Sequence, residues 1–213
     1  MDDENHNQEE KKGTNMVPTV IAIVVALSLI FVMALLFQKN TPVNSKLPVI
    51  RKAPDFTLVN QDNVSVSLSE LQGSTVIMSF IYTRCVDSDA CILFTENFKK
   101  IQDSFVDEDA SDVVLLSISF DPEYDTPQKL KEFGELYNAD FSNWHFLTGD
   151  HETVDNVTAD YNVYNEHHDH LGDEPITHML VSFLIDNDGY IRKEYYGNTW
   201  STETVTEDII KVM

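Results

Sequence analysis

Cys85 and Cys91 are the only cysteines in the chain, and five residues separate them. This interval is wider than the C-x-x-C of common redox motifs and matches none of the usual paired zinc spacings. Two thiols can close a disulfide, attack a substrate disulfide, or bind a soft metal such as copper(I). A purely structural disulfide is the simplest alternative, but closing so short a loop removes little entropy from the unfolded chain. The pair therefore favours a functional role and leaves redox and metal chemistry open.

The predicted elements around the cysteines place them at a strand-to-helix junction. Residues 74–82 (STVIMSFIY) form an almost continuous apolar run, which predicts a central strand covered on both faces. Residues 92–105 carry apolar side chains at helical spacing. Cys85 would follow the strand and Cys91 would open the helix, where unpaired N–H groups and the helix dipole stabilise a thiolate. This is the geometry of a thioredoxin-like active site.

The remainder of the folded part alternates between strand and helix patterns. The expected elements are a hairpin around residues 56–68, strands over 113–120, 144–147, 179–185 and 190–196, and helices after Pro127, over 152–161 and over 202–213. Asp125 or Thr126 can cap the helix that begins at Pro127. The sequence Asp-Asn-Asp-Gly at 186–189 indicates a hairpin turn between the last two strands. Strands that alternate with helices, with hairpins at both ends, predict an α/β fold with a mixed sheet flanked by helices. No nucleotide-binding or serine-hydrolase motif accompanies them.

A histidine is the expected third component of a thiol-based metal site. His178 opens the apolar strand ITHMLVSFLID, and α/β sheets usually place their sites at strand ends. The polar loop NEHHDHLGDEP contains three other histidines, His167, His168 and His170. They could hold zinc or copper(II), but a solvated loop without a metal is the favoured interpretation.

Four sequence blocks give the chain a resemblance to the Sco/SenC family: FIYTRC with the second cysteine, SISFDPEYDTPQKLKEF, NWHFLTG, and THMLVSFLIDNDGYIRKEYYG. They span about residues 53–196 in the family's order, and His178 precedes Asp186 by eight residues, as in the family. The resemblance implies a membrane-anchored, thioredoxin-like copper protein that helps to assemble the copper A centre of cytochrome c oxidase.

The family's copper ligands are two cysteines and one histidine, and the resemblance implies Cys85, Cys91 and His178 in these roles. The family spacing is C-x-x-x-C, whereas this chain has C-x-x-x-x-x-C, with Val86 and Ile92 in place of the motif prolines. Residues six apart on a regular helix point in different directions, so the two thiols can meet only across an irregular loop.

Two functions follow as hypotheses. The first is a copper chaperone that delivers one copper ion to the copper-binding subunit of the oxidase. The alternative is an enzyme, a thiol-disulfide oxidoreductase that keeps the cysteines of that subunit reduced, with Cys85 as the attacking thiol and Cys91 as the resolving one. A peroxide-reducing enzyme is disfavoured, because YTRC does not reproduce the peroxiredoxin pattern of a Pro and a Thr just upstream of the cysteine and an Arg elsewhere.

The longest apolar run indicates a membrane anchor. Residues 16–37 contain no charge over 22 residues, about 33 Å as a helix and enough to cross a bilayer. No A-x-A-like site follows, so a cleaved signal peptide is disfavoured. We therefore expect a cytoplasmic tail over 1–15, a transmembrane anchor over 16–37, a linker over 38–52 and a thioredoxin-like domain over 53–213.

The charge of the chain says more about its binding partners than about its orientation in a membrane. The 14 basic and 36 acidic residues give a formal net charge of −22, which repels phosphate and argues against nucleic acid as a partner. The positive-inside rule taken literally would put the domain in the cytoplasm, but long domains translocate regardless of flanking charge. Both functional hypotheses need an oxidising compartment beside a respiratory membrane. We therefore expect a single-pass protein of a bacterial inner membrane with its globular domain in the periplasm.

Overall fold

The computed structural model describes residues 27–33, 46–85, 92–105, 112–163, 165–166, 177–197 and 199–213. The chain divides into two compact units, Met1–Asn44 and Ser45–Met213. Within the first unit, residues 27–33 are helical. Among the described residues, no helix combines the length and the apolar character needed to cross a membrane. The other residues of the predicted anchor, 16–26 and 34–37, lie outside the described ones.

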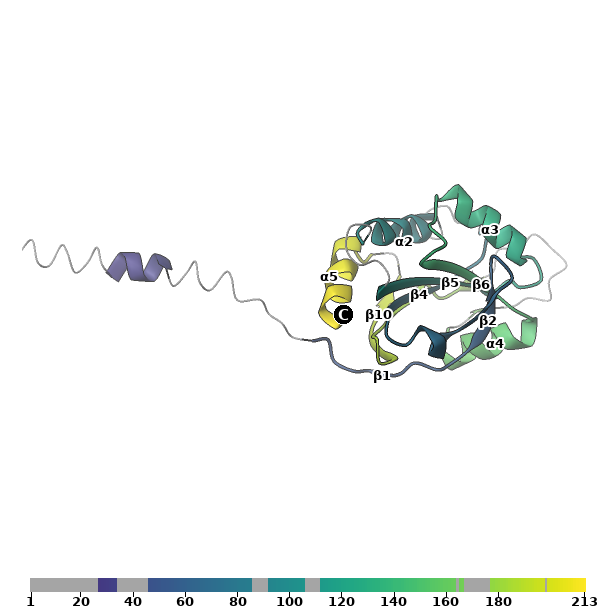
Figure 1. The fold of residues 1–213 in the computed structure, drawn as a ribbon, viewed down its shortest axis with the longest axis horizontal. Coiled ribbons are helices and arrows are strands. Elements are labelled where there is room, and N and C mark those ends of the chain that lie inside the picture. The colour runs from purple at the N-terminus through teal and green to yellow at the C-terminus, as the bar shows by residue number, and fades with distance from the viewer. Residues whose placement is uncertain are drawn as a thin grey trace, which may run out of the picture. The chain divides into compact units, whose positions relative to one another are not determined.

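An eight-stranded sheet forms the centre of the second unit (Figure 1). Its strands, in spatial order, are β1 (Arg51–Lys52), β10 (Tyr190–Tyr196), β9 (Val181–Ile185), β4 (Thr75–Ile81), β5 (Val113–Ser119), β6 (Trp144–Thr148), β2 (Thr57–Asn60) and β3 (Ser65–Ser67). The strands β4, β5 and β6 are parallel to one another, and every other pairing in this sheet is antiparallel. The expected mixed sheet is confirmed. Arg51 and Lys52, which the sequence assigned to the linker, belong to it.

Helices cover both faces of the sheet (Figure 1). One face carries α2 (Leu93–Asp103), α3 (Pro127–Leu136) and α5 (Thr202–Val212), and the other carries α4 (His151–Asp160). The strand β4 serves both layers because its side chains alternate. Ile77 and Ile81 pack in the core below α2 and α5, whereas Met78 and Phe80 pack in the core that includes α4. Burial on both faces explains the continuous apolar run in the sequence.

The register of the central strands brings three chain segments to one end of the sheet. Ile81 at the end of β4 lies opposite Ser119 at the end of β5. The antiparallel neighbour β9 pairs Ser182 with Ser79, so β9 begins where β4 ends. Three segments therefore meet at this end of the sheet: the residues that follow β4, those that follow β5 and those that precede β9.

Candidate functional site

Cys85 lies four positions after Ile81, the last residue of β4. It is partly buried and packs against the core on the α4 side of the sheet. Cys85 is disulfide-bonded, and the only other cysteine of the chain is Cys91, which lies outside the described residues. In this state Cys85 carries no thiolate, so the structure represents the oxidised form of the predicted site.

His178 reaches the same end of the sheet through its backbone. It belongs to β8 (Thr177–His178), which pairs antiparallel with β7 (Asn165–Glu166) so that His178 lies opposite Asn165. The strand β9 begins at Val181, three residues later, beside the end of β4. The backbone of His178 and the segment containing Cys85 therefore lie at the same end of the sheet. The predicted histidine cluster of residues 167, 168 and 170 lies outside the described residues.

A buried carboxylate fixes the chain just before Cys85. Asp125 is 0% exposed and accepts a hydrogen bond from the backbone N–H of Thr83 at 3.0 Å and another from the Thr83 hydroxyl. The hydroxyl of Ser119, the last residue of β5, also donates to this carboxylate at 2.5 Å. Burial raises the pKa of Asp125, and the hydrogen bonds from Ser119 and Thr83 oppose that rise.

A second aspartate holds the next residue. The guanidinium of Arg84 donates from Nε and Nη2 to Oδ2 of Asp121, each at 2.9 Å. The same guanidinium lies over the ring of Tyr124, 4.5 Å from its centroid, which is a cation–π distance. Asp121 donates its own backbone N–H to the Ser119 hydroxyl at 3.1 Å. Both aspartates therefore tie the segment before Cys85 to the end of β5.

The aspartates are residues whose role sequence reasoning missed. The block DPEYDTP suggested Asp125 or Thr126 as the cap of the following helix. In the structure Thr126 caps α3 by accepting from the backbone of Lys129 at 3.4 Å, and Asp125 turns inward to Thr83. The available signal was the position of Asp121 directly after the predicted strand 113–120, with Asp125 in the same short segment before Pro127, because residues that follow a buried strand lie where sites form in α/β sheets.

A pocket of about 390 Å³ adjoins the cysteine. Its lining comes from the end of β4, the start of the α2 region and the last turn of α3: Tyr82, Thr83, Cys85, Ile92, Phe133, Leu136 and Tyr137. Leu136 is 79% exposed at its rim. The wall beside the sulfur is thus mainly apolar and aromatic, a surface that suits a polypeptide side chain better than a free ion.

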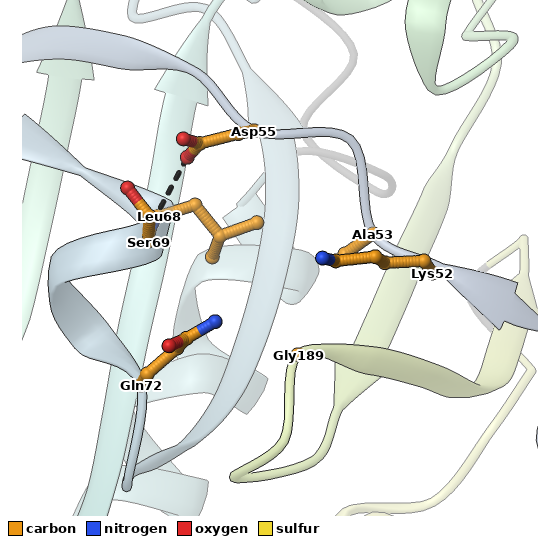
Figure 2. A pocket seen from close by; sticks show the side chains of 7 residues that line it. All are labelled: Lys52, Ala53, Asp55, Leu68, Ser69, Gln72 and Gly189. Atoms are coloured by element: carbon orange, nitrogen blue, oxygen red, sulfur yellow. Dashed lines mark hydrogen bonds between the residues drawn. The ribbon is translucent and has the colours of Figure 1, made fainter.

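A smaller pocket of about 90 Å³ lies at the opposite end of the sheet, between the first strands and the 186–189 turn (Figure 2). Asp55 points there toward the 3-10 helix η1 (Leu68–Leu71) and accepts from the backbone N–H of Ser69 at 2.9 Å and of Phe56 at 3.0 Å. These hydrogen bonds give the carboxylate a structural role in holding η1 against β2.

The predicted metal ligands are described only in part. Within the described portion of the chain, no three His, Cys, Asp or Glu side chains gather closely enough to hold a metal ion. Cys91 lies outside that portion, and His178 is described by its backbone alone. The assignment of Cys85, Cys91 and His178 as ligands stays a prediction.

Comparisons with known proteins agree with the sequence resemblance. A family model described as SCO1/SenC matches residues 46–213. A relative named SCO1 protein homolog, from Bacillus subtilis (strain 168), is 32% identical over 154 residues, which cover 71% of this chain and 77% of the relative.

Two solved structures extend the likeness to three dimensions. The copper-bound ScoI of Arabidopsis thaliana superposes with a TM-score of 0.63 at 27% identity, covering 75% of this chain and 96% of that one. BsSco, described as having a disulfide switch and as a member of the Sco family of cytochrome c oxidase assembly proteins, gives a TM-score of 0.66 at 27% identity, covering 78% and 96%. These likenesses confirm the expected thioredoxin-like α/β fold.

Proposed function

Because this chain belongs to the SCO1/SenC family, we propose that it is a copper chaperone for cytochrome c oxidase. Copper is its cargo, held by Cys85, Cys91 and His178 and passed to the copper-binding subunit of the oxidase. Support comes from the copper-bound ScoI of Arabidopsis thaliana and from BsSco, a member of a family of oxidase assembly proteins. Thiolate and imidazole are also ligands that suit copper.

The observation that carries the proposal is that Cys85 and the backbone of His178 lie at the same end of the sheet. Cys85 follows β4, and the backbone of His178 precedes β9 at the end where β4 finishes. A disulfide has no thiolate to offer, and Cys85 is disulfide-bonded. Copper binding through both sulfurs therefore requires prior reduction of the disulfide by two electrons, with two protons released when the thiols bind the metal.

The test is an anaerobic titration of the reduced full-length chain with copper(I), using a competing chelator. We expect one copper per chain and a large loss of affinity in Cys85→Ser, Cys91→Ser and His178→Ala. His151→Ala is the matched control, because His151 is an exposed histidine at the start of α4. Wild-type affinity in any one of the three site variants would remove that residue from the site.

Thiol-disulfide exchange is the second candidate function, and the disulfide at Cys85 beside an apolar pocket favours it. After two-electron reduction of its own disulfide, Cys85 would attack a disulfide of the oxidase subunit, forming a mixed disulfide and releasing one partner thiol. Cys91 would then attack the mixed disulfide, which releases the second partner thiol and re-forms the protein disulfide. A Cys91→Ser chain mixed with an oxidised peptide carrying the subunit's two cysteines should then accumulate a mixed disulfide. Cys85→Ser should form none, and equal trapping by both variants would exclude this order of attack.

Membrane attachment belongs to the same proposal. The uncharged residues 16–37 would anchor the chain in a bacterial inner membrane, with residues 1–15 in the cytoplasm and the globular unit in the periplasm. An alkaline phosphatase domain fused to the C-terminus should be active, because that enzyme needs an oxidising compartment. Replacing three central apolar residues of 16–37 by Lys should release the fusion from the membrane fraction, and an inactive full-length fusion would reverse the orientation.

A further inference from the structure

We propose that Asp125 and Asp121 are positioning residues that hold the Cys85 side of the site in one geometry, and that this hold favours the disulfide over the two free thiols. The inference concerns the same cysteine as the proposed function, but it does not depend on copper binding. It rests on the hydrogen bonds that reach Thr83 and Arg84, the two residues before Cys85.

The hold on Thr83 is strong because a buried carboxylate depends on it. Asp125 is 0% exposed and receives two hydrogen bonds from Thr83 and one from Ser119. Moving Thr83 away would leave a buried acceptor without two of these donors, which is costly in the interior of a protein. Thr83 therefore keeps its place whether Cys85 is a disulfide or a thiol.

Arg84 is held from two sides. Its guanidinium binds one carboxylate oxygen of Asp121 through two nitrogens and lies over the ring of Tyr124. Asp121 is itself 4% exposed and is fixed by its backbone hydrogen bond to Ser119. With two consecutive residues bonded to the segment after β5, the backbone that enters Cys85 has little freedom to move.

This restraint has a defined consequence for the redox equilibrium. When glutathione reduces the protein, the protein S–S bond breaks and an S–S bond forms between two glutathione molecules. Their two thiols supply two electrons and two protons, and both protein sulfurs end as thiols. A fixed Cys85 raises the effective concentration of one protein thiol toward the other, so it shifts this equilibrium toward the protein disulfide.

The test measures this equilibrium in glutathione buffers, by thiol alkylation of the full-length chain. Thr83→Val removes the hydroxyl donor at nearly constant volume and changes no charge, so a shift in this variant reports position rather than electrostatics. We expect the equilibrium to move about tenfold toward the free thiols, about 30 mV for a two-electron couple. Asp125→Asn should move it in the same direction. Thr83→Ser, which restores the hydroxyl, should recover most of the change.

Asp208→Asn is the matched control, because Asp208 is also buried, at 2% exposure, but bonds to β10 and α5. It should leave the glutathione equilibrium unchanged. A wild-type equilibrium in folded Thr83→Val would overturn the proposal, as would an equal shift in Asp208→Asn. The glutathione measurement is made without copper, so the two proposals can fail separately. If the chain fails to bind copper but Thr83→Val shifts the glutathione equilibrium, the chaperone function is wrong and this inference still holds.

Discussion

Thr83 donates both its backbone N–H and its hydroxyl to Asp125, 42 positions further along the chain. The pair joins the segment after β4 to the segment after β5, at the end of the sheet where Cys85 lies. It also explains why the charged block DPEYDTP follows an apolar strand. The aspartates of this block are internal acceptors that fix the chain beside the cysteine.

Ser119→Ala should destabilise the protein, because it removes a donor from the buried Asp125 carboxylate. We expect the free energy of unfolding to fall by about 1–3 kcal/mol. The pKa of Asp125 is already raised by burial, and losing this donor raises it further. A carboxyl with a raised folded pKa contributes stability below its unfolded pKa and loses that contribution as pH rises through the folded value. The loss in Ser119→Ala should therefore be larger at neutral pH than near pH 4.

Urea denaturation of Ser119→Ala at both pH values measures this difference. Ser79→Ala is the control, since Ser79 is a buried serine of β4 whose hydroxyl has no hydrogen-bond partner among the described residues. It should cost much less than Ser119→Ala. Equal losses at the two pH values would show that Asp125 does not feel the missing hydroxyl.

Gly134→Ala should loosen α3 from the sheet. A Cβ at Gly134 would lie 2.6 Å from Cε1 of Phe141 and 2.9 Å from Cε2 of Phe146. Alanine favours a helix over glycine by about 1 kcal/mol, but overpacking of a buried contact costs about 1–3 kcal/mol. We expect a net loss of stability, measured as a lower urea midpoint. Glu135→Ala, at the exposed next position of α3, should be close to neutral, and a stabilised Gly134→Ala would contradict the packing argument.

Asp208 should make stability sensitive to acid. Burial alone would raise its pKa, but the hydrogen bonds from Lys193, Lys211 and Tyr195 outweigh burial and leave the pKa below its usual value. A lowered carboxyl pKa gives stability that is present above the unfolded pKa and lost as pH falls through the folded one. Wild type should therefore lose stability below about pH 4. Asp208→Asn should be less stable at neutral pH and show a flatter acid limb in thermal unfolding, and an unchanged limb would refute the assignment.

His145 should make the stability of the protein depend on pH at higher pH values than Asp208 does. It lies in β6, and burial lowers its pKa, with Asp62 opposing the shift. A histidine with a lowered folded pKa favours the folded state above its unfolded pKa, near 6.5, and this stability is lost as pH falls below that value. His145→Gln should remove part of the stability change between about pH 7 and pH 5. An identical pH profile in His145→Gln would assign that change to other groups.

Local sequence patterns were enough to predict the long elements of this fold. The apolar run of β4, the helical spacing of α2 and the Asp-Asn-Asp-Gly turn between β9 and β10 are local patterns, because each reports the burial of its own segment. Resemblance of short blocks was enough to identify the family, since those blocks keep their order along the chain. Pro127 indicated the start of α3 and left Asp125 and Thr126 as possible caps, and the structure shows that Thr126 is the cap.

Local patterns do not predict which residues meet beyond the ends of β4 and β5. Nothing in the local pattern says that Thr83 bonds Asp125 rather than solvent, or that Arg51 pairs with Ile191 at the far edge of the sheet. Both contacts join residues far apart in sequence, and they form because strand order and register bring the segments together. The contribution of a buried carboxylate to stability depends on the donors around it, and those donors come together only in the folded chain.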